Sequence, residues 1–272
     1  MKLAARCLAL AVLIASASAV RAAEPERPVP RRLRALASDL DGAEAERVHA
    51  AIEALAASRH PYAVDALAAF LRRGQPDALA DHALAALGVM RLPRALGVLA
   101  DFAHHRRAEA RRQAYRSIAR VDDPAASDVL ARGLRDSDSG VRGVCAEALG
   151  ERHAVETLDL LFLALDRRVP EAAVAIGRIG DARSVARLHD ELGRQPIAVV
   201  LSADEAFLRR ADLDERVKLD IVGRLGEVAV PAVKAFLEGM LATLDLRDLP
   251  RLRAALSDTA RRIAVPPGPV PR

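Results

Sequence analysis

Aromatic side chains are scarce in this sequence. It has no tryptophan, two tyrosines and five phenylalanines among 272 residues, and its apolar half consists mostly of alanine, leucine and valine. Small and γ-branched side chains suit closely packed helices, whereas aromatic and β-branched side chains are typical of strands. The composition therefore predicts an all-α protein.

Cysteine is almost missing as well. The chain has Cys7, in a segment that we expect to be removed, and Cys145. A single remaining cysteine excludes an internal disulfide, so stability must come from packing. A reactive thiol needs exposure and neighbouring basic groups, and the sequence indicates neither. We therefore expect Cys145 to be a small core residue in a helix.

Long hydrophobic runs are also lacking, and the longest candidate is too short for a comfortable membrane span. This run, Cys7–Ala15, follows Lys2 and Arg6 and precedes a stretch of small residues. Such an order predicts a secretory signal peptide over residues 1–22, cleaved after Ala19 or Ala22. We expect a periplasmic or secreted protein with no membrane span after cleavage.

A strong excess of charge of one sign is missing too. The chain has 41 basic and 37 acidic residues, for a net charge of +4. Three of the basic residues, Lys2, Arg6 and Arg21, lie in the predicted signal peptide, which leaves +1 for the remainder. A nearly neutral body argues against a general polyanion binder, so nucleic acid is an unlikely partner, although a local basic patch stays possible.

Catalytic and cofactor motifs are not found. The sequence has no Gly-x-Ser-x-Gly elbow, no phosphate loop and no dinucleotide glycine pattern. Its seven histidines lack the spacing of a zinc site, and Asp81-His82 and His189-Asp190 lie far apart. We predict no enzyme activity, no catalytic or cofactor-binding residue, no metal site and no cofactor.

What the chain does have is an internal repeat. A short apolar string ends a predicted helix six times, and its middle residues are 32, 31, 31, 27 and 46 residues apart. The strings are Ala54-Leu55-Ala56, Ala86-Leu87-Gly88, Ser117-Ile118-Ala119, Ala148-Leu149-Gly150, Ala175-Ile176-Gly177 and Ile221-Val222-Gly223. A repeat of this length is typical of a solenoid. We interpret the last interval as one repeat of about thirty residues with an insertion over Gln195–Arg210.

Each repeat divides into two amphipathic helices. In the fourth, Ser139–Glu151 places Val141, Cys145 and Leu149 on one stripe, and His153–Asp166 does the same from Val155 to Leu165. One pair cannot bury its own apolar faces, so neighbouring pairs must stack.

The domain organisation follows from this pattern. We predict a solenoid over residues 31–264, with single capping helices at Arg31–Leu40 and Asp248–Ala264. Proline-rich stretches at residues 23–30 and 265–272 are interpreted as a linker and a tail.

Several of these residues resemble a known family. Asp136-Ser137-Asp138, Val141-Arg142, Ala148-Leu149-Gly150 and the run Ala175–Asp181 are similar to the bacterial HEAT-repeat family, including the HEAT-like repeats of phycobilisome lyases. The resemblance implies an α-solenoid of about six antiparallel helix pairs. It says little about function, because such arrays serve many roles.

Three residues are candidates for binding a partner. Arg111 and Arg142 lie 31 residues apart in the same register, so they should form a ladder along one side. We favour a structural role, in which Arg142 pairs with Asp136 or Asp138, over an anion-binding groove. Tyr115 lies beside arginines, where it is either an exposed interface anchor or a core residue.

These observations favour an exported, non-catalytic scaffold that binds a protein or peptide through its helical surface. Two alternatives remain at this point. One is a polyanion or nucleic-acid binder that uses the arginine ladder, and the other is a HEAT-like lyase, which the family resemblance implies.

Overall fold

The computed structural model describes residues 28–228 and 230–263. The predicted signal peptide, residues 23–27 of the predicted linker, and the predicted tail lie outside the described residues. Within the described part, the chain forms fifteen α-helices and no strand, which confirms the all-α prediction.

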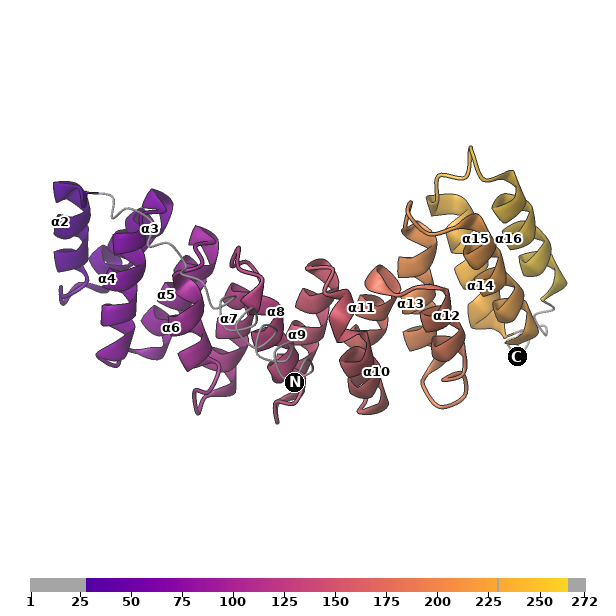
Figure 1. Cartoon of the computed structure of the whole chain (residues 1–272), viewed down its shortest axis with the longest axis horizontal. Coiled ribbons are helices and arrows are strands. Elements are labelled where there is room, and N and C mark those ends of the chain that lie inside the picture. The colour runs from indigo at the N-terminus through magenta and orange to yellow at the C-terminus, as the bar shows by residue number, and fades with distance from the viewer. Residues whose placement is uncertain (1–27, 229, 264–272) are drawn as a thin grey trace, which may run out of the picture.

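The helices follow one another with short connections (Figure 1). They are α2 (Arg31–Asp39), α3 (Ala45–Ser58), α4 (Pro61–Arg72), α5 (Asp77–Met90), α6 (Ala95–Phe102), α7 (Ala108–Ile118), α8 (Ala125–Gly133), α9 (Ser139–Glu151), α10 (Leu158–Asp166), α11 (Glu171–Ile179), α12 (Ala182–His189), α13 (Ile197–Arg209), α14 (Glu215–Val228), α15 (Pro231–Thr243) and α16 (Pro250–Arg262). A 3-10 turn, η1 (Val155–Thr157), precedes α10.

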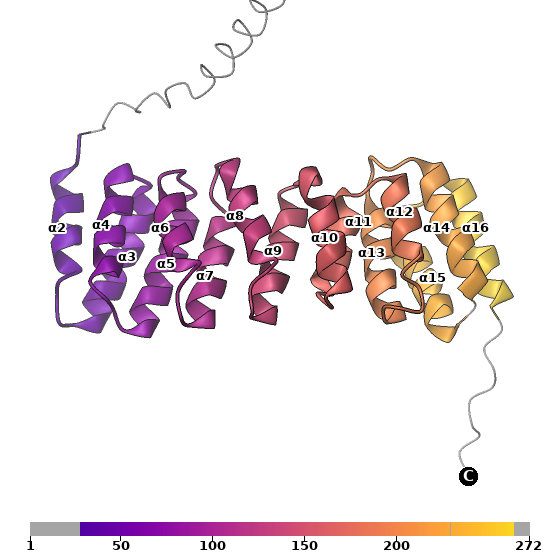
Figure 2. The same ribbon diagram turned by 60° about the horizontal axis from the view of Figure 1, so that its bottom comes forward.

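The helices form two rows along one elongated array (Figure 2). The odd-numbered helices α3 to α15 make up the first row, and the even-numbered helices α2 to α16 make up the second. Six antiparallel pairs run from α3–α4 to α13–α14. The single helix α2 covers one end, and α15 and α16 close the other. The predicted solenoid of about six helix pairs with capping helices is confirmed.

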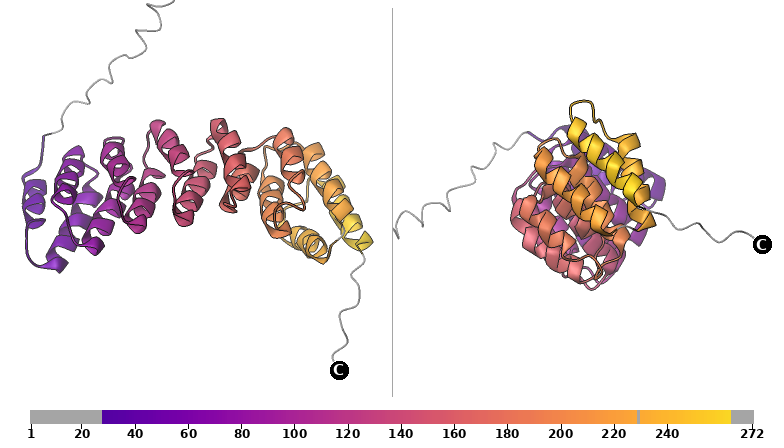
Figure 3. Two further views of the ribbon diagram at one scale, coloured as in Figure 1. Left: turned by 90° about the horizontal axis from the view of Figure 1, so that it is seen from below. Right: turned by 90° about the vertical axis from the view of Figure 1, so that its right-hand side faces the viewer.

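Small residues determine how closely the first row packs. A Cβ atom added to Gly150 in α9 would lie 2.8 Å from the Cα of Ala175 in α11, and one added to Gly177 would overlap the carbonyl oxygen of Ala203 in α13. From α4 to α12, the helices of the second row are further apart than those of the first. The first row therefore lies on the inner side of the curve that the array follows (Figure 1, Figure 3).

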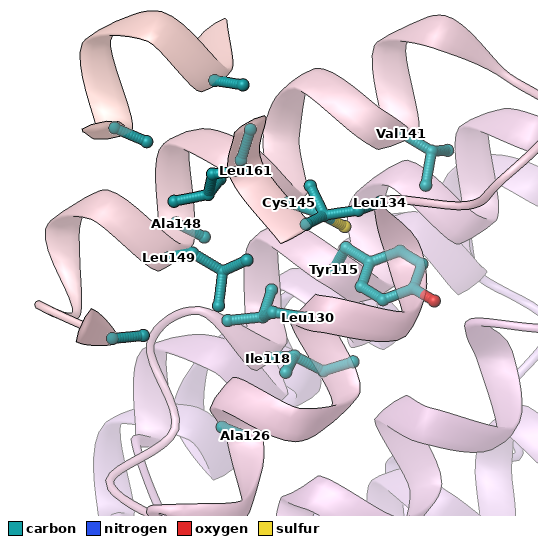
Figure 4. Packing of buried hydrophobic residues seen from close by; sticks show 14 of the residues in the cluster. Tyr115, Ile118, Ala126, Leu130, Leu134, Val141, Cys145, Ala148, Leu149 and Leu161 are labelled. Atoms are coloured by element: carbon teal, nitrogen blue, oxygen red, sulfur yellow. The ribbon is translucent and has the colours of Figure 1, made fainter. Parts of the chain in front are cut away.

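A continuous apolar core fills the space between the two rows. Ile118 from α7, Leu130 from α8, Cys145 and Leu149 from α9, and Leu161 from α10 meet at its centre (Figure 4). Burial raises the pKa of the Cys145 thiol well above its ordinary value. The structure thus confirms Cys145 as a core residue without the features of a reactive thiol.

The prediction of an insertion at Gln195–Arg210 is wrong. This segment forms α13, the first helix of the sixth pair, which packs directly against α11. Gly177 meets Ala203 as Gly150 meets Ala175, so Asp204 takes the register of Ile176, only 28 residues later. The periodicity did not reveal this repeat because a polar residue occupies the apolar position. The string at Ile221 belongs to α14, in the second row.

The start of the fourth unit's second helix is also corrected. The sequence predicts a helix from His153 that buries Val155, but α10 begins only at Leu158. His153 adopts a positive φ of 52°, and the 3-10 turn follows it. This turn directs Val155 outward, and its side chain is 54% exposed.

The register position of Asp204 carries a buried polar pair. Asp204 in α13 and His189 at the end of α12 are both fully enclosed, and His189 Nε2 lies 3.0 Å from Asp204 Oδ1. Their other polar atoms, His189 Nδ1 and Asp204 Oδ2, have no hydrogen-bond partner. Burial of such a pair in place of an aliphatic residue costs stability unless every polar atom is satisfied.

We expect the pair to be strongly coupled. Asp204→Ala or His189→Ala alone should lower the free energy of unfolding by about 3 kcal/mol, because each leaves a buried polar partner. The double change His189→Leu and Asp204→Leu should match or exceed the wild type in stability. Urea unfolding followed by circular dichroism measures all four proteins. A double variant less stable than both single variants would contradict this expectation.

The contribution of the His189–Asp204 pair to stability should also depend on pH. Burial raises the pKa of Asp204, and contact with His189 offsets only part of that rise. A carboxyl group with a raised folded pKa contributes most below its unfolded pKa of about 3.9 and loses that contribution as pH rises through the folded value. The stability of the wild type relative to the double-leucine variant should therefore fall as pH rises from about 4.

Candidate partner-binding surface around helix α10

Arg111 of α7 joins two successive units. Its Nη2 and Nε atoms donate to the two carboxylate oxygens of Asp136 at 2.7 and 2.8 Å, and its Nη1 donates to the carbonyl oxygen of His105 at 3.0 Å. Both side chains of the ion pair are largely buried. This two-pronged contact fixes the loop before α9 against α7 and leaves Arg111 little freedom to bind a partner.

Arg142 occupies the equivalent register, as predicted from the sequence. Its Nη1 donates to the carbonyl oxygens of Asp136 and Ser137, six and five residues earlier, as Arg111 does to the loop before α7. The structure differs from the expected pairing with a carboxylate, because the side chain of Asp136 is already held by Arg111. Within the described chain, Arg142 forms no ion pair.

Other arginines also link neighbouring units. Pairs of this kind hold α5 to α7, α7 to the loop before α9, and α10 to α12. They are Arg91–Asp122, Arg94–Asp65, Arg107–Asp81, Arg112–Asp138, Arg178–Glu151 and Arg187–Asp159. Arg111 and these six arginines therefore act as structural connections between units.

Tyr115 lies in the core. Its side chain is 5% exposed and packs beside Gly133 and Cys145 (Figure 4). Burial raises the pKa of its phenol to about 12. The sequence left open whether Tyr115 is an exposed interface anchor or a core residue. In the structure it is a core residue.

Exposed apolar side chains gather instead at α10. In the described residues, the large hydrophobic side chains with the greatest exposure are Val155, at 54%, Val89, at 48%, and Leu163, at 38%. Val155 lies in the turn that leads into α10, and Leu163 lies within α10. The sequence signal was the run Leu158–Asp166, which has more apolar residues than one buried stripe needs. The predicted stripe includes the buried Leu161, Phe162 and Leu165 and leaves Leu163 out.

A small slot separates α10 from α8. It has a volume of about 10 Å³ and apolar walls that include Leu134, Leu160 and Leu163. Arg135, just after α8, and Arg167, just after α10, line its end. The slot has room for no more than about one water-sized group, so only the tip of a side chain can enter it.

A larger and more open groove lies on the other side of α10, toward α12. Its volume is about 330 Å³, and it is lined by Val155, Phe162, Arg183 and Arg187 together with acidic side chains. Arg187 lies 3.9 Å above the Phe162 ring and also pairs with Asp159 at 2.8 Å. The turn before α10 contributes Val155 and Glu156 to this groove.

No metal centre or membrane helix accompanies this surface. In residues 28–228 and 230–263, no three histidine, cysteine or acidic side chains are placed to hold a metal ion. None of the described helices is long and apolar enough to cross a bilayer.

Comparison with protein families identifies the repeats. A model of HEAT repeats matches residues 99–171, and a model of the PBS lyase HEAT-like repeat matches residues 48–73. The chain contains HEAT repeats over these residues. The family resemblance drawn from the repeated strings is thereby confirmed. No sequence of a curated protein matches the chain.

Several solved structures are similar to the chain. The complex of CpcE and CpcF of phycocyanin lyase from Nostoc sp. PCC7120 is 18% identical with a TM-score of 0.46, and the match covers 90% of this chain and 100% of that one. Human deoxyhypusine hydroxylase is 17% identical, with a TM-score of 0.42 and coverage of 85% and 96%. A homology model of the AP-3 complex is 11% identical, with a TM-score of 0.53, and covers 84% of this chain and 50% of that one.

The Arg111–Asp136 pair should contribute measurably to stability. Arg111→Gln removes hydrogen bonds to a largely buried carboxylate and should lower the free energy of unfolding by about 1.5–3 kcal/mol. The matched control is Arg91→Gln, which breaks an exposed pair of the same 2.7 Å length and should change stability little. Equal losses in the two variants, measured by urea unfolding, would contradict the structural role of Arg111.

The effect of Arg111→Gln should also weaken in acid. Burial alone would raise the pKa of Asp136, but hydrogen bonds from Arg111 and from the Asp138 N–H lower it below the ordinary value. A lowered folded pKa stabilises the protein above the unfolded pKa, and this contribution is lost as pH falls through the folded pKa. The stability difference between wild type and Arg111→Gln should therefore narrow below a pH of about 4.

Proposed function

We propose that this HEAT-repeat protein is an exported, non-catalytic scaffold that binds a protein or peptide partner along the surface of α10. The observation that carries the proposal is the convergence of two hollows and two exposed apolar side chains on this one helix and the turn before it. Val155 borders the groove toward α12, and Leu163 borders the slot toward α8.

The shape of this surface favours a polypeptide partner. Sites for small molecules are usually enclosed pockets of about 300–1,000 Å³ that bury most of the ligand. The groove beside α12 is open and mixes apolar walls with charged side chains, and the slot beside α8 takes only the end of a side chain. Apolar contacts surrounded by polar groups are typical of protein interfaces.

The alternatives gain less support. Arg111, the first member of the proposed anion-binding ladder, is held by Asp136, which removes it from a polyanion groove. A lyase activity rests on the type of repeat alone, since arrays of this fold serve many roles. The match of residues 48–73 to the PBS lyase HEAT-like repeat indicates how these helices are built and assigns no reaction.

The test of the α10 surface is capture of a partner from the native cell. Val155→Asp combined with Leu163→Asp should abolish crosslinking to the partner, because a charge in an apolar contact is costly. Both side chains are exposed, so the fold should persist, as circular dichroism and thermal unfolding can check. Val89→Asp is the matched control, since Val89 is similarly exposed but lies on α5. Equal capture by the wild type and the double variant would refute the α10 site.

Export is a separate part of the proposal, supported by the residues at positions 1–22. The precursor, expressed in its native cell with a C-terminal tag, should yield a mature chain that begins at Val20 or Ala23 in the envelope or external fraction. Mass spectrometry of the N-terminus measures this directly. An unprocessed chain in the cytoplasm would contradict export and renew the polyanion and lyase hypotheses.

A further inference from the structure

The arginines around the slot between α8 and α10 differ from the arginines that link the repeats. Arg135 and Arg167 are exposed and line the slot, and Arg168 follows directly. In the part of the chain that the structure describes, none of the three forms an ion pair or a side-chain hydrogen bond. By contrast, the cross-repeat arginines such as Arg111 are held by carboxylates of the next unit.

The sequence explains why this location lacks internal acids. Before α9, the loop Asp136-Ser137-Asp138 supplies the carboxylates that hold Arg111 and Arg112. The fifth unit has Arg167-Arg168-Val169-Pro170 in that place, so the acidic loop is replaced by two guanidinium groups. Asp166 is the nearest acid in sequence. Its one negative charge offsets only part of the charge of Arg167 and Arg168, so this end of α10 has a net positive charge.

The local backbone fixes the loops that carry these side chains. Arg142 donates to the carbonyl oxygens of Asp136 and Ser137, which fixes the loop that begins at Arg135. Arg168 has a positive φ of 63°, and the N–H of Val169 bonds to the carbonyl oxygen of Ala164, so the turn after α10 is tightly closed. A fixed loop loses less entropy on binding than a mobile one, so these two loops favour recognition.

We propose that the slot binds an acidic segment of a protein partner, with the tip of one aliphatic side chain against Leu134, Leu160 and Leu163 and carboxylates on Arg135 and Arg167. This inference deepens the proposed function and rests on it. Guanidinium groups match carboxylates in geometry and bind them through two parallel hydrogen bonds. The apolar walls of the slot give the aliphatic side chain a dry contact between the two charges.

The same features disfavour an extended nucleic acid. The slot walls are apolar and narrow, which suits an aliphatic side chain and not a phosphate. Exposed acids lie elsewhere along the two helices, at Asp128 on α8 and Asp159 on α10. A continuous phosphate backbone would pass near these carboxylates, whereas a peptide can place its charges only where the arginines are.

The test uses the purified mature chain and three labelled probes in fluorescence anisotropy. They are a short peptide with one leucine between glutamates, its counterpart with glutamines, and a short DNA duplex. The acidic peptide should bind, bind more weakly as salt rises, and exceed the neutral peptide in affinity. Arg135→Glu with Arg167→Glu should weaken its binding by at least about tenfold.

A matched control separates local contact from net charge. Arg251 and Arg253 are exposed on α16, far along the array, and Arg251→Glu with Arg253→Glu changes the net charge by the same amount. This variant should retain nearly all binding. Equal affinity for the acidic and neutral peptides, equal losses in the two double variants, or tighter binding of DNA would each overturn the proposal.

Partner capture then distinguishes this inference from the proposed function. If Val155→Asp with Leu163→Asp abolishes capture while Arg135→Glu with Arg167→Glu does not, the α10 surface stands and the acidic specificity fails. If neither variant affects capture, both proposals fail together.

Discussion

Close stacking of the first-row helices is the constraint on which the rest of this structure depends. A single helix pair leaves its apolar stripe exposed, and only contact with the next pair removes it from water. Gly150 and Gly177 bring α9, α11 and α13 close together, because a Cβ atom at either position would collide with the neighbouring helix. The second row is held further apart, and this difference produces both the curve of the array and the hollows beside α10.

The arginines extend this constraint into the loops. Where an acidic loop precedes a first-row helix, as at Asp136 and Asp138, the arginines of the previous unit bind it and become part of the framework. Where that loop is lost, as before α11, Arg167 and Arg168 stand in its place, and neither forms an ion pair in the described part of the chain. Arg111 in the predicted ladder is therefore structural, whereas Arg167 takes the place of the lost acids.

The sequence predicted the fold well wherever repeats kept their apolar register. The helix Ser139–Glu151 was predicted to the residue, because its stripe and the Asp138 cap both indicate it. Two features could not be predicted from periodicity. Asp204 is a polar residue at the position where an apolar residue would have indicated the repeat in α13. His153 has a positive φ, and α10 therefore begins later than the sequence predicts. The candidate surface was missed for a related reason, since the slot and the groove exist only between helices of different units, and no single segment contains them.

The His189–Asp204 pair marks the place where the packing of the array changes. Up to α13, the closest contacts run along the first row, but beyond it α16 packs against α14 in the second row and against α15. An aliphatic residue at position 204 would satisfy the core and could pack in several ways, whereas a buried carboxyl group needs one partner in one place. The pair therefore trades stability for a defined geometry at the junction, an effect known for single buried polar residues in coiled coils. Because α12 carries both His189 and Arg187, the orientation fixed by this pair also sets one wall of the groove beside α10.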